Sequence, residues 1–336
     1  MMNEQISALG LDPGQVGAVL TAAGRAPSLH NSQPWRFRLS PHSIELHADL
    51  DRQLPAADPD GRELRLACGA ALYNLKLALY GLRIRPIVTL FPEATQPAFI
   101  AVVRRGGVTA ATPHQLRLLE AIPRRRTNRR PFADIPVGPP ERHALRQAVV
   151  EEGSWLYTVD DPARRQTLRQ LAAQAHRRQL ADPDFVAELA RWTGTTPDRR
   201  DGVPASAGGP QPAPQDHWTL RDFTAGTAPD RIAGLNFEAE PMLAVLTPHA
   251  AGPEAEIRAG HALQRLLLTA TTLGLAASFL SQLVEVAAAR EQLRRLISAT
   301  RPPLAVLRIG RGYPVPATPR RDVADLVIPD PTTVHS

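Results

Sequence analysis

The pattern of hydrophobic and polar residues predicts helices and strands along most of the chain. Asp12 followed by Pro13 is a typical helix start, because the carboxylate can cap free amides and proline fits the first helical position. Apolar residues recur at steps of three and four through 58–82, which predicts a long helix buried on one face. Residues 35–39 and 44–47 alternate with a period of two, which predicts a hairpin of two strands.

The other elements follow from the same two periods. Further helices are predicted over 112–123, 139–150, 161–180, 183–192, 253–274 and 284–297, and further strands over 84–91, 98–104, 155–159, 241–247 and 304–309. Strands and helices in this order indicate an α+β protein whose helices cover its sheets. Each half of the chain has a capped helix, strands and one long apolar helix, so a fused duplication is one possibility.

One internal segment and the C-terminal tail lack this periodicity. Residues 193–230, which we call the lid segment, contain six prolines and five glycines without a sustained apolar period. A segment of this length inside a compact protein is typically a functional lid or a disordered linker. The proline-rich tail, 313–336, is expected to be extended.

The apolar stretches do not indicate membrane insertion or export. Residues 266–284 are uncharged and long enough to span a bilayer. They contain three threonines, two serines and a glutamine, which favours a buried helix that runs into a strand or loop. Residues 1–14 carry acidic side chains and no apolar core, so they do not resemble a signal peptide. We expect a cytoplasmic protein that does not bind membranes.

Composition narrows the possible chemistry. The chain has 39 basic and 33 acidic residues among 336, and Lys76 is the only lysine, so the other 38 basic residues are arginines. Schiff-base or P-loop chemistry would need Lys76, which follows no glycine-rich loop. The single cysteine, Cys68, excludes an intrachain disulfide and a multi-cysteine zinc site, and it fits a reducing compartment. A net charge of +6 is mild for this length, so nucleic-acid binding is not expected without clustering on one face.

The densest charge cluster is 124–130, with five arginines in seven positions. These side chains repel one another, and guanidinium groups bind phosphate through paired hydrogen bonds. A phosphate-bearing ligand and a solvated surface loop are both compatible with this pattern.

A second cluster, 27–35, concentrates hydrogen-bonding side chains between two prolines. Such a set suits the polar edge of a planar heterocycle, and a turn that satisfies its own backbone explains it equally well. His30 is a weaker candidate for a catalytic base. We find no serine-hydrolase elbow around Ser28 and no metal-ligand spacing among the ten histidines.

These motifs together resemble those of the nitroreductase family. Residues 26–37, APSLHNSQPWRF, are similar to the family's flavin-contacting segment, and 125–129, RRTNR, to its flavin-phosphate motif. The two occur in the reverse of the usual order, and this inversion resembles the Acg-type subfamily of actinobacterial flavin-binding proteins. Further motifs support the subfamily resemblance: Asp58-Pro59, Arg62-Glu63, 68–72, 280–282 and 319–321. Leu283 and Val284 follow Gln282, where the subfamily commonly has proline and then glutamate.

The resemblance implies a nitroreductase-like α+β fold, in which one chain forms a pseudo-dimer of two halves, 1–110 and 111–336. Each half would supply part of one FMN site. The phosphate would be held by Arg125, Arg126, Thr127 and Arg129, helped by Arg320 and Arg321. The isoalloxazine ring would be lined by Pro27, Ser28, His30, Asn31 and Gln33, with Ser281 and Gln282 at its polar edge.

Two functions are compatible with this resemblance. One is an oxidoreductase that passes hydride from NAD(P)H through FMN to a nitroaromatic or quinone-like acceptor, and the flavin carries this chemistry without a catalytic protein residue or metal. The other is a non-enzymatic FMN-sequestering protein, whose lid segment blocks the nicotinamide. A pseudo-dimer has little need of a partner, so we expect a monomer or a weak homodimer.

Overall fold

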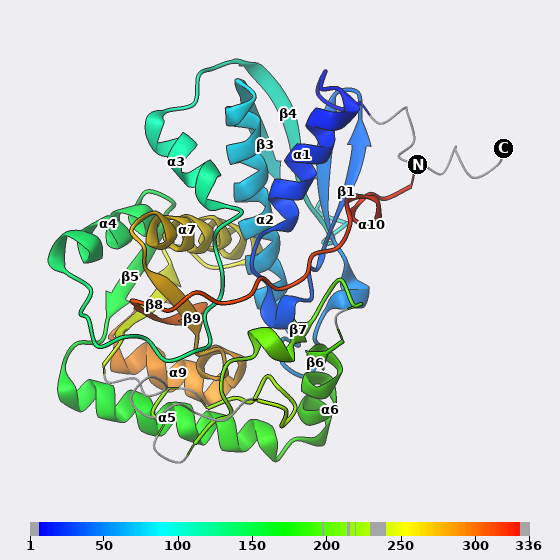
Figure 1. Cartoon of the computed structure of the whole chain (residues 1–336). Coiled ribbons are helices and arrows are strands. Elements are labelled where there is room, and N and C mark those ends of the chain that lie inside the picture. The colour runs from blue at the N-terminus through cyan, green and yellow to red at the C-terminus, as the bar shows by residue number, and fades with distance from the viewer. Residues whose placement is uncertain (1–6, 197, 214–215, 219, 229–239, 330–336) are drawn as a thin grey trace.

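The computed structural model contains two antiparallel four-stranded sheets with the same strand order (Figure 1). It describes residues 7–196, 198–213, 216–218, 220–228 and 240–329. The first sheet has the order β1 (Trp35–Ser40), β2 (Ser43–Ala48), β4 (Phe99–Val108) and β3 (Ile84–Leu90). The second has the order β5 (Ser154–Thr158), β8 (Met242–Pro248), β10 (Ala305–Gly310) and β9 (Ala276–Phe279).

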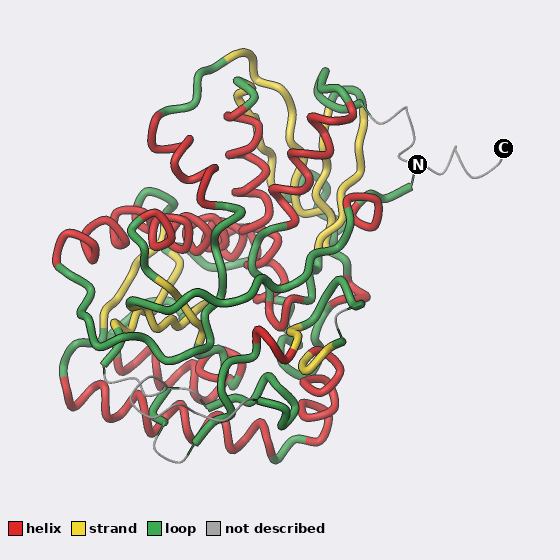
Figure 2. The backbone as a smooth tube through the Cα atoms, in the orientation of Figure 1, coloured by secondary structure: helices red, strands yellow, loops and turns green. Residues whose placement is uncertain are grey.

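The helices repeat in the same way. One helix precedes the first strand of each sheet, α1 (Pro13–Gly24) and α4 (Pro139–Val150). A 20-residue helix joins the second strand to the third, α2 (Arg62–Gly81) and α7 (Pro253–Thr272). Figure 2 shows the strands of the two sheets in separate groups with helices between them. The predicted α+β fold is therefore confirmed, and the repeated plan is consistent with the predicted pseudo-dimer.

The two halves meet where α2 crosses α7. Gly69 and Gly260, each the eighth residue of its helix, lie against each other, and a Cβ on either glycine would stand 2.2 Å from a carbonyl oxygen of the opposite helix. Further along, the Gln264 side-chain amide donates a buried 2.7 Å hydrogen bond to Asn74. The absence of side chains at the crossing lets the two backbones touch.

The second half carries two insertions that the first half lacks. One, between β5 and β8, contains α5 (Pro162–Leu180), α6 (Pro183–Trp192) and the parallel pair β6 (Thr193–Thr195) and β7 (Val203–Pro204). The other, between β9 and β10, contains α8 (Gln282–Glu285) and α9 (Ala287–Leu296). In Figure 1, α5, α6 and α9 lie together at the end of the molecule opposite the first sheet.

Several elements differ from the sequence expectation. Gly274, with a φ of 69°, ends α7, and the chain then forms β9, where the sequence predicted either a strand or a loop. The predicted helix 284–297 is divided at Val286, whose backbone is extended. α3 (Pro113–Ala121) ends two residues before Pro123, and α2 begins at Arg62 after the left-handed Gly61.

The C-terminal tail returns to the first half of the molecule. It contains one helical turn, α10 (Val323–Leu326), although the sequence predicted an extended chain. After this turn the Ile328 amide donates a 2.8 Å hydrogen bond to the Phe37 carbonyl on β1. Residues 330–336 of the predicted tail lie outside the described residues. Within the part of the chain that is described, no helix is both long and apolar enough to cross a membrane.

Candidate functional site

A cavity of about 1000 Å³, measured to its open mouth, lies between the two halves. Its wall includes α2 and α7, the end of β9, and part of the lid segment. Seven of the predicted site residues line it: Pro27, Ser28, His30, Thr127, Arg129, Ser281 and Gln282. The fold thus brings residues of the 27–35 cluster to the same cavity as residues about 100 and 250 positions further along the chain.

The 27–35 cluster adopts an unusual backbone. His30, Asn31 and Gln33 have positive φ angles of 48°, 58° and 53°. L-residues rarely adopt this conformation, which costs of order 1 kcal/mol or more each and is found most often at functional sites. The Ser28 hydroxyl accepts a 2.9 Å hydrogen bond from the Gln33 amide and closes the turn.

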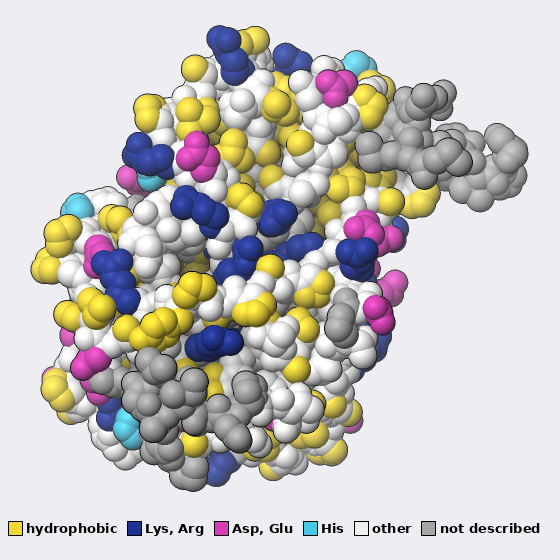
Figure 3. Space-filling view, in the orientation of Figure 1, with side chains coloured by type: hydrophobic (Ala, Val, Ile, Leu, Met, Phe, Trp, Pro, Cys, Tyr) yellow, Lys and Arg dark blue, Asp and Glu magenta, His cyan; other side chains and the backbone are white. Residues whose placement is uncertain are grey.

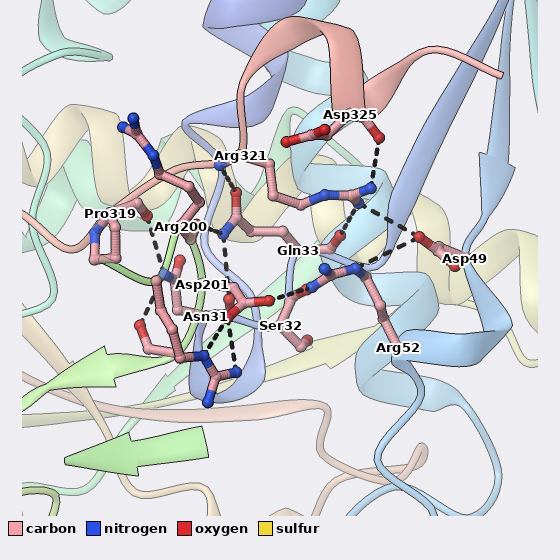
Figure 4. A network of polar contacts seen from close by, with 12 residues as sticks. Asn31, Ser32, Gln33, Asp49, Arg52, Arg200, Asp201, Pro319, Arg321 and Asp325 are labelled. Carbon is pink, nitrogen blue, oxygen red and sulfur yellow. Dashed lines mark hydrogen bonds and ion pairs between the residues drawn. The ribbon is translucent and has the colours of Figure 1, made fainter. Parts of the chain in front are cut away.

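The side chains of Asn31 and Gln33 do not line the cavity. They belong to the polar network that Figure 4 shows. Asn31 donates hydrogen bonds to the carbonyls of Gly202, in the lid segment, and Pro319, in the tail. Gln33 donates to the Arg200 carbonyl at 2.9 Å and accepts from the Arg321 amide at 2.9 Å. Both side chains therefore fasten the lid segment and the tail to the first half, and their contact with a flavin ring stays a prediction.

Two arginines near this network are already paired with carboxylates. Arg321 lies 3.4 Å from Asp49, and it also donates to the backbone carbonyls of Gln33 and Trp35. Arg52 forms a 2.8 Å ion pair with Asp201 of the lid segment. The Arg321 guanidinium is thus committed to structural contacts, and the structure does not place it with the arginines described next.

A cluster of arginines without acidic partners adjoins the cavity. Arg125 is buried and Arg320 is half-buried, and Arg25 and Arg126 lie close enough to act on their charge. No ion pair to a carboxylate is found for these four among the described residues, and the Nε atoms of Arg125 and Arg320 lack hydrogen-bond partners. Figure 3 shows Lys and Arg side chains gathered in a band across the middle of this face.

The charges in this cluster oppose one another. Burial, and then the neighbouring guanidinium groups, lower the pKa of Arg125 to about 10 and that of Arg320 to about 9. Both remain charged at pH 7, so the protein keeps uncompensated positive charge in a poorly solvated place. An anion bound there would offset that cost.

Arg129 joins this cluster to the cavity. Burial, followed by the charges of Arg221 and Arg125, lowers its pKa to about 10. Its guanidinium lies 4.5 Å from the centre of the Phe223 ring and donates to the Ala207 carbonyl at 3.1 Å.

The lid segment covers part of the cavity. Gly208, Trp218, Leu220, Arg221 and Phe223 all line it. Arg221 forms a 2.6 Å ion pair with Glu285 of α8, and their side chains are only 6% and 1% exposed. Removing one partner of a buried ion pair strongly destabilises a folded protein, so this contact fixes the lid segment to α8 beside the cavity. Of the predicted segment, residues 197, 214–215, 219 and 229–230 lie outside the described residues.

Known proteins resemble this chain over nearly its whole length. No model of a protein family matches it. Its sequence is 34% identical to "Putative NAD(P)H nitroreductase Rv3131" of Mycobacterium tuberculosis over 339 aligned positions. This alignment covers 94% of this chain and 92% of that protein. It is 33% identical to "Putative NAD(P)H nitroreductase acg" of the same organism, over 93% of this chain and 94% of that protein. The chain belongs to the nitroreductase family.

A solved structure supports the same conclusion for the fold. The crystal structure of a "putative nitroreductase" from Anabaena variabilis covers 89% of this chain and 88% of its own, with a TM-score of 0.53 and 11% identity. The resemblance to the nitroreductase family and its Acg-type members, inferred from the motifs, is confirmed.

Two titratable side chains in the nitroreductase-family cavity have strongly shifted pKa values. Burial, then the charges of Arg221 and Arg129, hold the pKa of His30 well below its usual range, so His30 is neutral. Burial, then the nearby Glu285 and Asp58 carboxylates, hold the pKa of Glu63 well above its usual range. The cavity therefore presents a neutral imidazole and a carboxyl group that favours its protonated form.

Sequence reasoning missed several residues of this site. Glu63 was noted as part of a motif and given no role. Trp218, Arg221 and Phe223 line the cavity but belong to a segment without periodicity. The two aromatic residues were the sequence signal that could have predicted a buried surface there. The described residues contain no group of three or more His, Cys, Asp or Glu side chains that could hold a metal ion.

Proposed function

We propose that this protein binds FMN in the cavity and acts as an NAD(P)H-dependent oxidoreductase. The observation that carries the proposal is the cluster of one buried and three half-buried arginines without acidic partners, which lies beside Thr127 and Arg129 of the cavity wall. The terminal phosphate of FMN supplies the anion that such a cluster needs, and guanidinium groups match its geometry. Relatives named NAD(P)H nitroreductases support the same assignment.

The residues at the cavity fit the cofactor. Arg125, Arg126 and Arg320 would hold the phosphate, and Arg129 lies between the phosphate end and the ring end. Ser281 and Gln282 offer neutral hydrogen-bonding groups for the polar edge of the ring. When bound, FMN supplies the hydride chemistry.

The protein's own residues bind, orient and exclude water. Trp218, Leu220 and Phe223 bring apolar surface over the cavity and limit water at the ring. We propose a nitroaromatic or quinone-like acceptor, since a flat oxidant is able to stack within such walls. Each half, 1–110 and 111–336, contributes one part of the site. A second copy is then not required, and we propose a cytoplasmic monomer or weak homodimer.

The closed lid segment favours a second candidate function, FMN sequestration. Residues that line the cavity from the lid occupy one side of it, and the buried Arg221–Glu285 pair keeps them there. A lid that does not open would keep nicotinamide from the ring.

Flavin reduction separates the two functions. The purified protein is examined for bound flavin by visible absorbance, and NADH or NADPH is then added without oxygen. Rapid bleaching supports the oxidoreductase. A flavin that dithionite reduces and nicotinamide does not supports sequestration, and a protein that takes up no FMN contradicts both.

The phosphate site has its own test. The double variant R125A/R126A loses two charge-assisted interactions with the phosphate, each worth about 1.5–3 kcal/mol, so the Kd for FMN should rise at least about 100-fold. R124A is the matched control, because Arg124 belongs to the same run and is exposed. Equal FMN affinity in the double variant and the control refutes the assignment.

A further inference from the structure

Glu63 occupies a special position between two cavities. It lies in the first turn of α2 and lines the large cavity described above. It also lines a second cavity of about 430 Å³, measured to its mouth, whose wall includes Asp58, Asp60 and Arg290. Asp60 is 58% exposed, so this second cavity reaches solvent. Val284 and Leu304 separate the two cavities together with Glu63, since all three belong to both walls.

No hydrogen bond or ion pair of the Glu63 carboxyl is found among the described residues, although charged groups surround it. Glu285 on α8 and Asp58 before α2 face it with negative charge, and Arg221 of the lid segment and Arg290 of α9 face it with positive charge. Arg221 is already paired with Glu285. The carboxyl is therefore free to exchange a proton with a molecule in the cavity.

The proposed reaction needs such a group. Reduction of a quinone to a hydroquinone consumes one hydride and one proton, and reduction of a nitro group to a nitroso group and water does the same. The flavin chemistry supplies the hydride, which carries both electrons. The proton must come from the protein or from water, and the apolar lid residues limit water at the ring.

We propose that Glu63 donates this proton to the acceptor oxygen and regains one from solvent through the second cavity. The O–H bond of the carboxyl breaks, an O–H bond forms on the acceptor, and the remaining carboxylate takes a proton from water. This role rests on the proposed oxidoreductase function. Burial and the neighbouring carboxylates keep the pKa of Glu63 high, which suits a donor at neutral pH.

A structural role is the alternative, because an acidic residue in the first turn stabilises a helix through its dipole. The chain offers a matched control for that role. Glu254 is the second residue of α7, as Glu63 is of α2, and its side chain is 57% exposed and paired with Arg258. E63Q and E254Q replace the same carboxyl group at the same helical position, and only E63Q changes the cavity.

The test uses the FMN-loaded protein and follows the two half-reactions separately by stopped flow. The flavin is reduced with dithionite and reoxidised anaerobically by a benzoquinone. We expect E63Q to retain FMN, to reoxidise at least about tenfold more slowly than wild type at pH 7, and to lose the pH dependence of that step. E254Q should match wild type, and E63D should recover the pH dependence.

An infrared measurement provides a readout that does not depend on turnover. At pH 7 the wild-type and E254Q spectra should contain the band of a protonated carboxyl group that E63Q lacks. Absence of that band, or wild-type reoxidation of E63Q, overturns the role of Glu63. The proposed function fails by a different result, a wild-type flavin that neither NADH nor NADPH reduces, because dithionite makes the reoxidation step measurable in either case.

Discussion

The glycine contact between α2 and α7 predicts how the two halves respond to one added methyl group. In G69A the new Cβ would stand 2.2 Å from the Ile257 carbonyl oxygen and 3.0 Å from the Gly260 Cα. Both neighbours are backbone atoms and cannot rotate away, so the two helices must separate. The same helices carry cavity-lining side chains, among them Leu66 and Leu263.

A control glycine allows the magnitude to be worked out. Gly17 in α1 has no atom within 4 Å of an added Cβ, so G17A should gain up to about 1 kcal/mol from helix propensity. G69A gains the same amount and loses about 3 kcal/mol from overpacking. The two variants should therefore differ by about 3 kcal/mol. With an unfolding entropy of about 2.1 cal/mol/K per residue, the 336-residue chain should show a difference of about 4 °C in Tm.

Thermal unfolding of the flavin-free protein measures this difference, because bound FMN would add its own stabilisation. FMN affinity is measured in parallel. G69A should melt below wild type and bind FMN more weakly, whereas G17A should melt at or above wild type with unchanged affinity. A G69A protein that melts as high as G17A would show that the crossing does not depend on direct backbone contact.

Three further predictions concern the lid segment and the start of α2. R221M leaves Glu285 as a buried charge without its arginine and should lower the free energy of unfolding by about 3–5 kcal/mol. In urea titrations the double variant R221M/E285Q should recover most of this loss. If the losses of the two single variants simply add in the double variant, the pairing is contradicted. N31A removes hydrogen bonds to the lid segment and the tail, each worth about 1 kcal/mol, and should increase amide hydrogen exchange in both by about fivefold. Unchanged exchange would mean that other contacts fasten the two segments. Burial is the main cause that raises the pKa of Asp58 from 3.8 to about 6, so the stability that protonated Asp58 contributes is complete below pH 4 and is lost as the pH rises through 6. D58N should therefore reduce the fall in unfolding free energy between pH 4 and pH 7 by about 2–3 kcal/mol. An equal fall in wild type and D58N would show that Asp58 titrates normally.

Local sequence signals were sufficient for most helices and strands. Asp12 and Thr112, each followed by proline, cap α1 and α3 through their side chains, as those residue pairs predict. The sequence did not decide between a strand and a loop at β9, because its four buried or half-buried residues look no different from the apolar helix before them. The pairing with β10, which is distant in the sequence, is what makes this segment a strand.

The candidate site was predictable only in part. Motif resemblance selected the 27–35 cluster and the arginine run, and the structure brings residues of both to one cavity. The motif resemblance did not distinguish Arg320 from Arg321, which are adjacent in the tail. Arg321 meets the carboxylate of Asp49, a residue 272 positions away, whereas Arg320 donates to the neutral side chain of Asn31 and feels the charges of other arginines.

The sequence by itself determined most of the secondary structure and indicated the family, because periodicity, caps and motifs are local properties of the chain. Only the tertiary structure decided which charged groups have partners. Burial and the nearest opposite charge depend on residues far apart in sequence, so they determine that Arg221 is paired, that Arg125 is not, and that Glu63 lies between two cavities.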